Sequence, residues 1–277
     1  MPSTTTTRRG VRDGVGTDAA RPDGVPKVQG RFAFSSDAFT EGMLWGRTLR
    51  SPHPAARVLG IDTSAAERID GVEVVVTAAD VPGTATFGLE HADQPVFASE
   101  VVRYEGEPIA AVAADHPETS RRAAEAIVVD YEPVEPLVDV EVALDADPIH
   151  PDGNVVRHIR IVHGTPDDVA GDVIVEGEYE VGMQDQAFMG PESGLAIPDG
   201  AGGVDLYIST QWLHVDRDQV AACLALEPEQ VRLTLSGVGG AFGAREDVSL
   251  QVHVCLLALR SGRPVKMVYS REESFFG

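Results

Sequence analysis

Glycines are concentrated in residues 237–246, whose sequence is GVGGAFGARE. Four of the first seven residues in this segment are Gly, which reaches positive φ cheaply and lets the backbone approach a ligand closely. If a helix follows, the free N–H groups of its first turn favour an anion. The segment therefore predicts a loop that binds a phosphate or oxo group. A tight turn that packs a helix against a strand and binds nothing explains the same glycines.

The familiar glycine motifs do not fit this spacing. A P-loop requires a Lys directly after its last Gly, whereas Ala244 and Arg245 follow Gly243. A dinucleotide-binding fingerprint requires a third Gly where this chain has Phe242. The Gly-x-Ser-x-Gly turn of serine hydrolases is absent from the sequence. A nucleotide-binding α/β domain that uses the loop in another way stays open.

The segments around the loop are expected to hold it between regular elements. Residues 231–235 predict a strand, and residues 264–269 predict another. Between them, residues 246–260 alternate in part like a strand, but their length and Gly262 just beyond favour a helix with a glycine C-cap. A strand, helix, strand order of this length predicts parallel pairing of the two strands.

The first half of the chain alternates strand and helix patterns, which predicts one α/β unit over residues 30 to 140. A helix is expected behind an Asp115 N-cap, with an acidic first turn, to about residue 126. A second, short helix is expected at residues 63–69. Strands are expected at residues 43–49, 56–61, 72–77, 108–114 and 127–131.

The second half begins after a long connection. Residues 133–166 are rich in Pro, Asp and Gly, which predicts a domain boundary near residue 142. Strands are then expected at residues 173–181, 194–198 and 204–209, with a short amphipathic helix at 216–224 whose core face includes Cys223. The fold class is thus α+β (mixed α/β). The expected organisation is a disordered tail at 1–24, one domain at 25–142 and a second at 143–277.

The composition restricts the class of protein. The 277 residues include 44 acidic and 22 basic side chains, and the formal charge of -22 disfavours nucleic acid and anionic lipid as partners. No apolar run is long enough for a membrane span, and the first residues lack the apolar core of a secretory signal, so we expect a cytoplasmic protein without a membrane partner. The two cysteines, Cys223 and Cys255, lie in apolar segments and cannot ligate a four-thiolate iron–sulfur cluster.

Several motifs, in their order along the chain, are similar to one family. Residues 239–246 resemble the glycine-rich, Phe-containing, Glu-ending loop of the molybdenum-binding subunit in the xanthine dehydrogenase and aldehyde oxidase family. The STQ sequence at 209–211, MGPE at 189–192 and SREE at 270–273 resemble further elements of that subunit. LRSPH at 49–53 and RYEGEP at 103–108 resemble its α/β hammerhead domain. The resemblance covers nearly everything after residue 22, and implies a hammerhead domain followed by the first part of a molybdopterin-binding domain.

The resemblance implies a role for each matching residue. Gln211 matches the glutamine that donates to an oxo ligand of the molybdenum, and Phe242 with Gly243 matches the backbone that passes beside the metal. Gly240 and Ala241 belong to the same cofactor-binding loop, although Ala241 and Ala244 stand where the family often has Gly.

Glu246 matches the glutamate that contacts a purine substrate; a solvated Glu in a first helical turn is the alternative. Arg245 is expected to pair with Glu246 or a phosphate, or to be an ordinary surface charge. His253 is interpreted as a satisfied core histidine.

The implied activity is oxidative hydroxylation of a purine such as hypoxanthine or xanthine. The implied cofactor is a molybdenum–pterin group, with electrons passing to Fe–S and FAD on partner subunits and then to NAD. Because the family's general base lies several hundred residues downstream, the chain is expected to be incomplete as a catalyst, and an oligomer with further chains is expected. The alternatives are a non-catalytic fragment that docks partner subunits and an oxidoreductase for aldehydes or other N-heterocycles.

Overall fold

The apolar run at residues 108–114 forms β7, in which all seven residues are buried, and the rest of the fold is assembled on both of its faces. Ala110 and Val112 pack against the helix α3 (Pro117–Ala126). Ala111 and Ala113 pack into the main core beside α6 (Gln251–Ser261). Since successive side chains of a strand point to opposite faces, the continuous apolar run records a strand covered on both sides.

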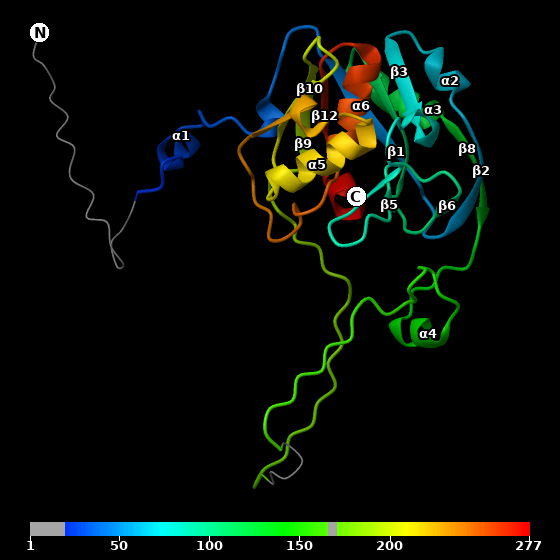
Figure 1. Cartoon of the computed structure of the whole chain (residues 1–277), viewed down its shortest axis with the longest axis vertical. Coiled ribbons are helices and arrows are strands. Elements are labelled where there is room, and N and C mark those ends of the chain that lie inside the picture. The colour runs from blue at the N-terminus through cyan, green and yellow to red at the C-terminus, as the bar shows by residue number, and fades with distance from the viewer. Residues whose placement is uncertain (1–19, 166–170) are drawn as a thin grey trace, which may run out of the picture.

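The computed structural model describes residues 20–165 and 171–277. Residues 1–19 of the expected disordered tail lie outside the described residues. A seven-stranded mixed sheet has the order β11-β10-β9-β12-β1-β7-β3, so strands from both halves of the chain share one sheet (Figure 1). This confirms the expected mixed α/β class.

The elements have the following bounds. The helices are α1 (Gly24–Val28), α2 (Ser64–Glu67), α3 (Pro117–Ala126), α4 (Val140–Asp145), α5 (Leu213–Leu224), α6 (Gln251–Ser261) and α7 (Arg271–Phe276). Short 3-10 turns are η1 (Ser35–Asp37), η2 (Ala78–Asp80) and η4 (Pro228–Gln230). The strands are β1 (Leu44–Arg50), β2 (Ala56–Asp62), β3 (Val72–Thr77), β4 (Thr86–Phe87), β5 (Gln94–Pro95), β6 (Val101–Val102), β7 (Pro108–Ala114), β8 (Val128–Pro133), β9 (Ser193–Pro198), β10 (Val204–Ile208), β11 (Val231–Leu235) and β12 (Val265–Val268).

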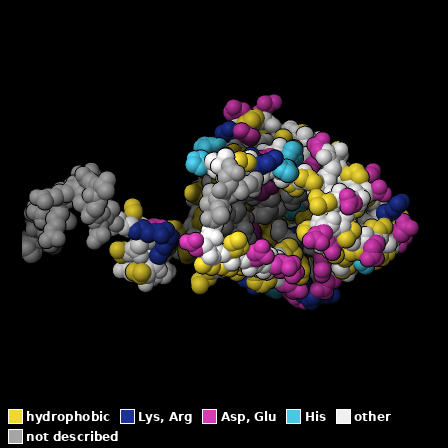
Figure 2. All heavy atoms as spheres, turned by 90° about the horizontal axis from the view of Figure 1, so that it is seen from below, with side chains coloured by type: hydrophobic (Ala, Val, Ile, Leu, Met, Phe, Trp, Pro, Cys, Tyr) yellow, Lys and Arg dark blue, Asp and Glu magenta, His cyan; other side chains and the backbone are white. Residues whose placement is uncertain are grey.

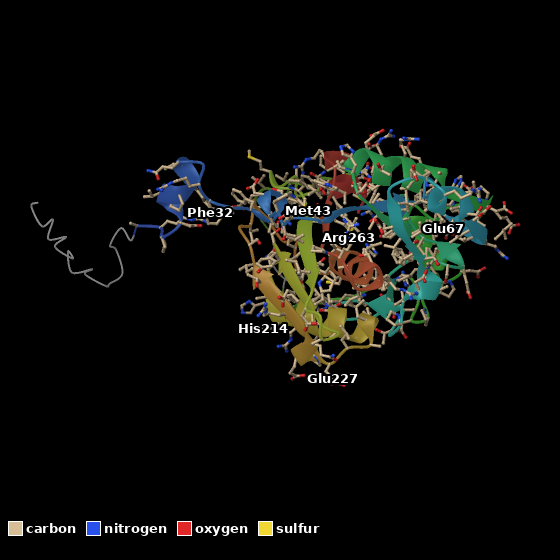
Figure 3. The ribbon with its side chains drawn as sticks, turned by 90° about the horizontal axis from the view of Figure 1, so that it is seen from above. Phe32, Met43, Glu67, His214, Glu227 and Arg263 are labelled. Carbon is tan, nitrogen blue, oxygen red and sulfur yellow. The ribbon has the colours of Figure 1, made fainter. Side chains whose placement is uncertain are left out.

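The main core surrounds α6, which lies near the centre of the molecule in Figure 3. Residues 251–258 of this helix are all buried, including Gln251 and His253. His253 stacks on Phe97 at 4.6 Å, and its Nε2 lies 2.7 Å from the carbonyl oxygen of Val96, which confirms a core position. Its Nδ1 is buried and has no hydrogen-bond partner among the described residues, so the expectation that the ring is fully satisfied is wrong. Burial raises the pKa of the thiols of Cys223 and Cys255, so both behave as small apolar side chains.

The expected strand at residues 173–181 is wrong. These residues have no regular secondary structure and are exposed. A strand needs a partner for its backbone hydrogen bonds, and within the described part of the chain no backbone hydrogen bond joins this segment to another one. The other strands expected from the sequence are confirmed as β1, β2, β3, β7, β8, β9, β10, β11 and β12.

The helix after the glycine-rich loop is confirmed, but it begins at Gln251 rather than at Glu246. The side chains of Asp247 and Gln251 accept hydrogen bonds from the N–H groups of Val248 and Ser249, at 2.8 and 2.7 Å, and these local bonds compete with helix formation. The helix ends at Gly262, whose φ of 66° confirms the glycine C-cap. The first-turn N–H groups are therefore eight residues beyond Gly243 and do not adjoin the loop, so binding of a phosphate or oxo group by the loop itself stays a prediction.

The expected pairing of the strands on either side of α6 is also wrong, although their direction is right. β11 pairs in parallel with β10, and β9 lies between β10 and β12 with antiparallel pairing on both sides. β12 instead pairs in parallel with β1. The helix α5 begins at Leu213, three residues before the expected start, and α4 lies in the long connection. The domain boundaries remain predictions.

The surface is acidic, as the composition requires. In Figure 2, Asp and Glu side chains outnumber Lys and Arg on the visible face. In the described residues, no helix has both the length and the apolar character that crossing a membrane needs.

Candidate functional site

The glycine-rich loop follows β11 as irregular backbone with an unusual conformation. Gly240, Phe242 and Gly243 have φ values of 105°, 55° and 91°. A bulky residue such as Phe rarely adopts positive φ, so the surrounding contacts must hold this conformation. The Phe242 side chain is 77% exposed, and a Cβ at Gly243 would have nothing within 4 Å. The tip of the loop thus has a positive-φ backbone and is open to solvent.

Two glycines from distant segments meet beneath this tip. The N–H of Gly190 donates to the carbonyl of Gly239 at 3.0 Å. A Cβ at Gly239 would lie 2.7 Å from the Cα of Gly190, and a Cβ at Gly190 would lie 2.9 Å from the Cα of Gly239. Only glycine fits at either position, because the atoms that would clash belong to the backbone. The MGPE segment and the loop are thus brought together by backbone contact.

The buried Arg245 side chain forms hydrogen bonds with three motif segments, which are the glycine-rich loop, STQ and MGPE. Its Nε donates to the carbonyl of Gly240 at 3.0 Å, and Nη1 donates to the hydroxyl of Ser209 at 2.9 Å. Nη2 donates to the carbonyl of Gly190. The guanidinium carbon lies 4.4 Å from the centre of the Phe188 ring. Because guanidinium presents a fixed fork of donors, this one side chain sets the relative positions of all these segments.

The sequence interpretation missed this role of Arg245. The residue is only 4% exposed, whereas a partner at Glu246 or a surface position was expected. Burial lowers the pKa of the Arg245 guanidinium, and Glu192 opposes that shift. The group stays charged, since arginine is not deprotonated in proteins. An Arg in a polar segment is usually exposed, so its residue type predicts a surface position. The one sign of a buried role in the sequence was that Arg245 lies inside a motif.

Gln211 lies against the backbone of Arg245. The Gln211 N–H donates to the carbonyl of Arg245 at 2.8 Å, and the Arg245 N–H donates to Oε1 of Gln211 at 3.3 Å. The Thr210 hydroxyl donates to the same Arg245 carbonyl at 3.2 Å. Since only an oxygen can accept from an N–H, these contacts assign the amide orientation. The Nε2 hydrogens of the exposed Gln211 side chain are left to donate to a ligand.

The six residues singled out from the sequence therefore lie together. Glu246 follows Arg245 directly and is half-buried, and Ala241 is half-buried while Phe242 and Gly243 are exposed. Of the three alternatives for Arg245, pairing with Glu246 and a surface position are wrong, because its side chain is 4% exposed and its Nη2 donates to the carbonyl of Gly190; pairing with a phosphate stays a prediction. The Arg245 side chain instead turns inward to Gly190 and Gly240.

A cavity of about 190 Å³ lies on the same motif segments. It is lined by Phe34, Ser35, Ser36, Met189, Gly190, Pro191, Ser193, Ser209, Gly237 and Gly239. Ser35 brings the N-terminal segment into the site, since its hydroxyl bonds to those of Ser193 and Ser209. None of the six residues singled out from the sequence lines this cavity.

The site fits a cofactor better than a metal bound directly by protein side chains. Within residues 20–165 and 171–277, no group of three or more His, Cys, Asp or Glu side chains could hold a metal ion. By contrast, the free Nε2 donors of Gln211 and the open backbone at Gly243 suit a group that carries its own metal. Gln211 and the loop from Gly240 to Gly243 would hold such a group.

Comparisons with known proteins agree with these observations. The domain described as aldehyde oxidase and xanthine dehydrogenase, a/b hammerhead domain, matches residues 29–135, and the molybdopterin cofactor-binding domain matches residues 149–277. A probable xanthine dehydrogenase subunit of Bacillus subtilis is 40% identical over 258 residues, which cover 92% of this chain and 35% of the relative. The chain belongs to the xanthine dehydrogenase and aldehyde oxidase family.

Further members of the family differ in their named substrates. The nicotinate dehydrogenase large molybdopterin subunit of Eubacterium barkeri is 36% identical over 264 residues, which cover 94% of this chain and 62% of that subunit. The crystal structure of quinoline 2-oxidoreductase from Pseudomonas putida 86 has a TM-score of 0.84 at 28% identity, and the match covers 95% of this chain and 35% of that one. The chain thus carries the hammerhead domain and the start of the molybdopterin-binding domain, and spans only part of each relative's length.

Proposed function

We propose that this chain contributes part of the active site of a molybdenum hydroxylase that acts on a purine such as hypoxanthine or xanthine. The observation that carries the proposal is the hydrogen bonding between Gln211 and Arg245. The side-chain oxygen of Gln211 accepts from the Arg245 N–H, so the side-chain N–H groups of Gln211 can donate to a ligand. A molybdenum–pterin group, when bound, would supply the transfer of an oxygen atom from water to a substrate carbon and accept the electron pair. Fe–S and FAD on partner subunits would carry the electrons away.

The residues of this chain would bind and orient. Gln211 would donate a hydrogen bond to an oxygen of the cofactor, where a neutral amide avoids the repulsion that a carboxylate would cause. The backbone from Gly240 to Gly243, with Phe242 between them, would pass beside the cofactor. Glu246, which is half-buried and unpaired in the described structure, would share a proton with a ring nitrogen or oxygen of the purine.

Hydroxylation of a different N-heterocycle is the second candidate. It is supported by the names of the relatives, which include a nicotinate dehydrogenase and a quinoline 2-oxidoreductase. A carboxylate such as Glu246 can share a proton with the ring nitrogen of many heterocycles, so the residue alone does not select a purine.

The test is to purify the chain with its partner subunits and assay xanthine, hypoxanthine, nicotinate and an aldehyde. Gln211→Ala should lower kcat by about 10²-fold, the usual effect of losing one donor to a developing charge. Glu246→Gln should lower kcat/KM for purines by roughly 10²-fold and change the aldehyde rate little. Glu67→Gln, on the exposed surface of α2, is the control and should keep full activity.

Two results would refute the proposal. Absence of both molybdenum and turnover in the intact assembly would remove the hydroxylase assignment. Full activity in both Gln211→Ala and Glu246→Gln would instead leave the chain as a module that only docks its partners.

A further inference from the structure

Asp216 is a fully buried carboxyl outside the group of residues that would bind cofactor or substrate. It lies in the first turn of α5 and is 0% exposed. Nε2 of Gln251, the first residue of α6, donates to Oδ2 of Asp216 at 3.0 Å. The other carboxyl oxygen, Oδ1, is buried and has no hydrogen-bond partner in the described part of the chain. An oxygen left unpartnered in the core costs free energy, so the carboxyl calls for an explanation.

The surroundings of Asp216 offset only part of this cost. Burial raises the pKa of the Asp216 carboxyl, and the side chains of Thr210 and Gln251 act against the shift through hydrogen bonding. The carboxyl of Asp247 raises the pKa further. None of these influences comes from a cation. The groups that favour a carboxyl at this position are therefore Thr210 and Gln251, which come from two different segments of the candidate site.

Thr210 connects Asp216 to the contacts of Gln211. The Thr210 hydroxyl donates to the carbonyl of Arg245 at 3.2 Å, and the N–H of Gln211 donates to the same carbonyl at 2.8 Å. The Thr210 oxygen also accepts from the N–H of Trp212 at 3.2 Å. Because Thr210 is 4% exposed, these bonds form away from water. The hydroxyl that acts on Asp216 thus belongs to the backbone contact that holds Gln211 against Arg245.

Gln251 connects Asp216 to the segment that follows the glycine-rich loop. While Nε2 of Gln251 donates to Asp216, its Oε1 accepts from the N–H of Ser249 at 2.7 Å. Gln251 is 2% exposed, and its helix α6 contacts α5 (Figure 1). Ser249 is three residues after Glu246, which would contact the substrate. Asp216 therefore lies between the segment that carries Gln211 and the segment that carries Glu246.

We propose that Asp216 is a positioning residue that connects the STQ segment to the start of α6. Through Thr210 it would fix the backbone of Gln211. Through Gln251 it would fix the segment that carries Glu246. The role depends on hydrogen bonds to both neighbours rather than on the charge of the carboxyl, and Asp216 itself touches neither cofactor nor substrate. The inference rests on the proposed function, because it concerns the relative positions of Gln211 and Glu246.

A residue that only packs α5 against α6 is the alternative. The other buried residues of α5 are apolar, and they are Val220, Ala221, Cys223 and Leu224. An apolar side chain at position 216 would continue this face without an unpartnered oxygen, and replacing buried polar groups by apolar ones is often neutral or stabilising. Stability alone therefore does not account for a carboxyl here.

The kinetic experiment compares variants in the intact assembly, with turnover expressed per bound molybdenum. Asp216→Leu should lower kcat about tenfold and keep KM within about twofold, because the Gln211 amide loses its fixed direction. Asp216→Asn keeps a donor and an acceptor in the same shape and should keep kcat within about threefold of the original. Asp218→Leu is the matched control and should change neither value, since Asp218 is exposed on the same helix and pairs only with Arg217 in the described structure.

Hydrogen exchange measured by mass spectrometry gives a second result that needs no turnover. In Asp216→Leu, peptides from residues 209–212 and 244–249 should exchange about tenfold faster than in the original assembly, whereas peptides from β7 should be unchanged. Asp216→Asn should restore the original exchange. Thr210→Val breaks the same connection and should reproduce the pattern of Asp216→Leu, so it replaces that variant if Asp216→Leu does not fold.

Four results would overturn the proposal. Unchanged exchange in both segments of Asp216→Leu and Thr210→Val would show that Asp216 does not hold them, and faster exchange at full kcat would show that the contacts do not serve the reaction. Faster exchange that extends to β7 would indicate a general packing role. An Asp216→Asn variant as impaired as Asp216→Leu would show that the charge is required. An original assembly without molybdenum or turnover would instead refute the proposed function, and the exchange results would still decide whether Asp216 holds the two segments.

Discussion

The glycine-rich loop and residues 172–183, which we call the acidic limb because they carry Glu176, Glu178 and Glu180, both lead into the contacts around Arg245, and they are held in opposite ways. The loop lacks regular secondary structure, yet hydrogen bonds from Arg245 and Gln211 fix its backbone. The acidic limb has the alternation of a strand, yet its apolar side chains are exposed and its backbone groups are unpaired within the described residues. Order in this molecule therefore follows from buried contacts, because they offset the entropy of fixing a backbone.

Removing Arg245 should have the largest effect on stability. Arg245→Met keeps much of the side-chain length and leaves Ser209 and the carbonyls of Gly190 and Gly240 without their donor. The free energy of unfolding should fall by roughly 3 kcal/mol. Arg157→Met, at an exposed position in the long connection, should change it by less than about 0.5 kcal/mol. Urea unfolding followed by circular dichroism measures both, and equal values would show that Arg245 does not hold the loop.

A glycine-to-alanine substitution should have the next largest effect, and the loss of stability should differ between the glycine-rich loop and the acidic limb. Gly239→Ala would bring a Cβ to 2.7 Å from the Cα of Gly190, and should destabilise the fold by about 2 kcal/mol. In the acidic limb, a Cβ at Gly182 meets nothing within 4 Å. Gly182→Ala is therefore the matched control and should be neutral or slightly stabilising. A neutral Gly239→Ala would contradict the close backbone crossing.

Acid should lower the free energy of unfolding through the buried His253 in the main core. Burial lowers the pKa of His253 to about 4 from 6.5, so the folded state keeps the ring neutral while the unfolded state binds a proton below pH 6.5. This contribution to stability is complete above pH 6.5 and is lost as the pH falls towards 4. Between pH 7.5 and 5.5 the loss from this residue should be roughly 1.4 kcal/mol.

The measurement is urea unfolding at both pH values for the original chain and for two variants. His253→Gln can still donate to the Val96 carbonyl and should remove this part of the pH dependence. His158→Gln, at an exposed position in the long connection, should leave the pH dependence unchanged. If all three proteins lose stability equally on acidification, His253 is not the group responsible.

Shortening an apolar side chain in the acidic limb should have the smallest effect. Val175→Ala should change the unfolding free energy of the isolated chain by less than about 0.5 kcal/mol, since the side chain is 85% exposed. Val112→Ala in β7, where the side chain is fully buried, is the reference and should cost about 2 kcal/mol. A large loss at Val175 would show that the limb is already packed in solution.

The strands and helices around the main sheet could be predicted from the sequence because their apolar patterns indicate which residues are buried. β7 is a continuous apolar run, and α6 has both a suitable length and Gly262 as its stop. Residues 173–181 show the limit of such patterns, because alternation reports which face is apolar but not whether a partner is present to cover it. The start of α6 was misplaced for a similar reason, since the side-chain bonds of Asp247 and Gln251 are local details that periodicity does not reveal.

Some residues of the candidate site could be predicted from the sequence and others could not. The resemblance of the motifs selected Gln211, Glu246 and the loop from Gly240 to Gly243, and the structure places these residues together. It did not select Arg245, because a charged residue in a polar segment is expected at the surface. The burial of Arg245 depends on acceptors at Gly190 and Ser209, and no pattern within the loop indicates them.

By itself, the sequence determined that this chain is a mixed α/β protein with a glycine-rich loop after a strand, and that Gly240 and Gly243 can adopt positive φ. Those properties are local, since they depend on residue type and short-range spacing. Only the tertiary structure decided that Arg245 holds the loop through the carbonyl of Gly240, and that the side chains of Val175, Tyr179 and Val181 are exposed. Arg245 and its acceptor Gly190 are 55 positions apart, and a contact at that separation is made by the packing of the whole chain.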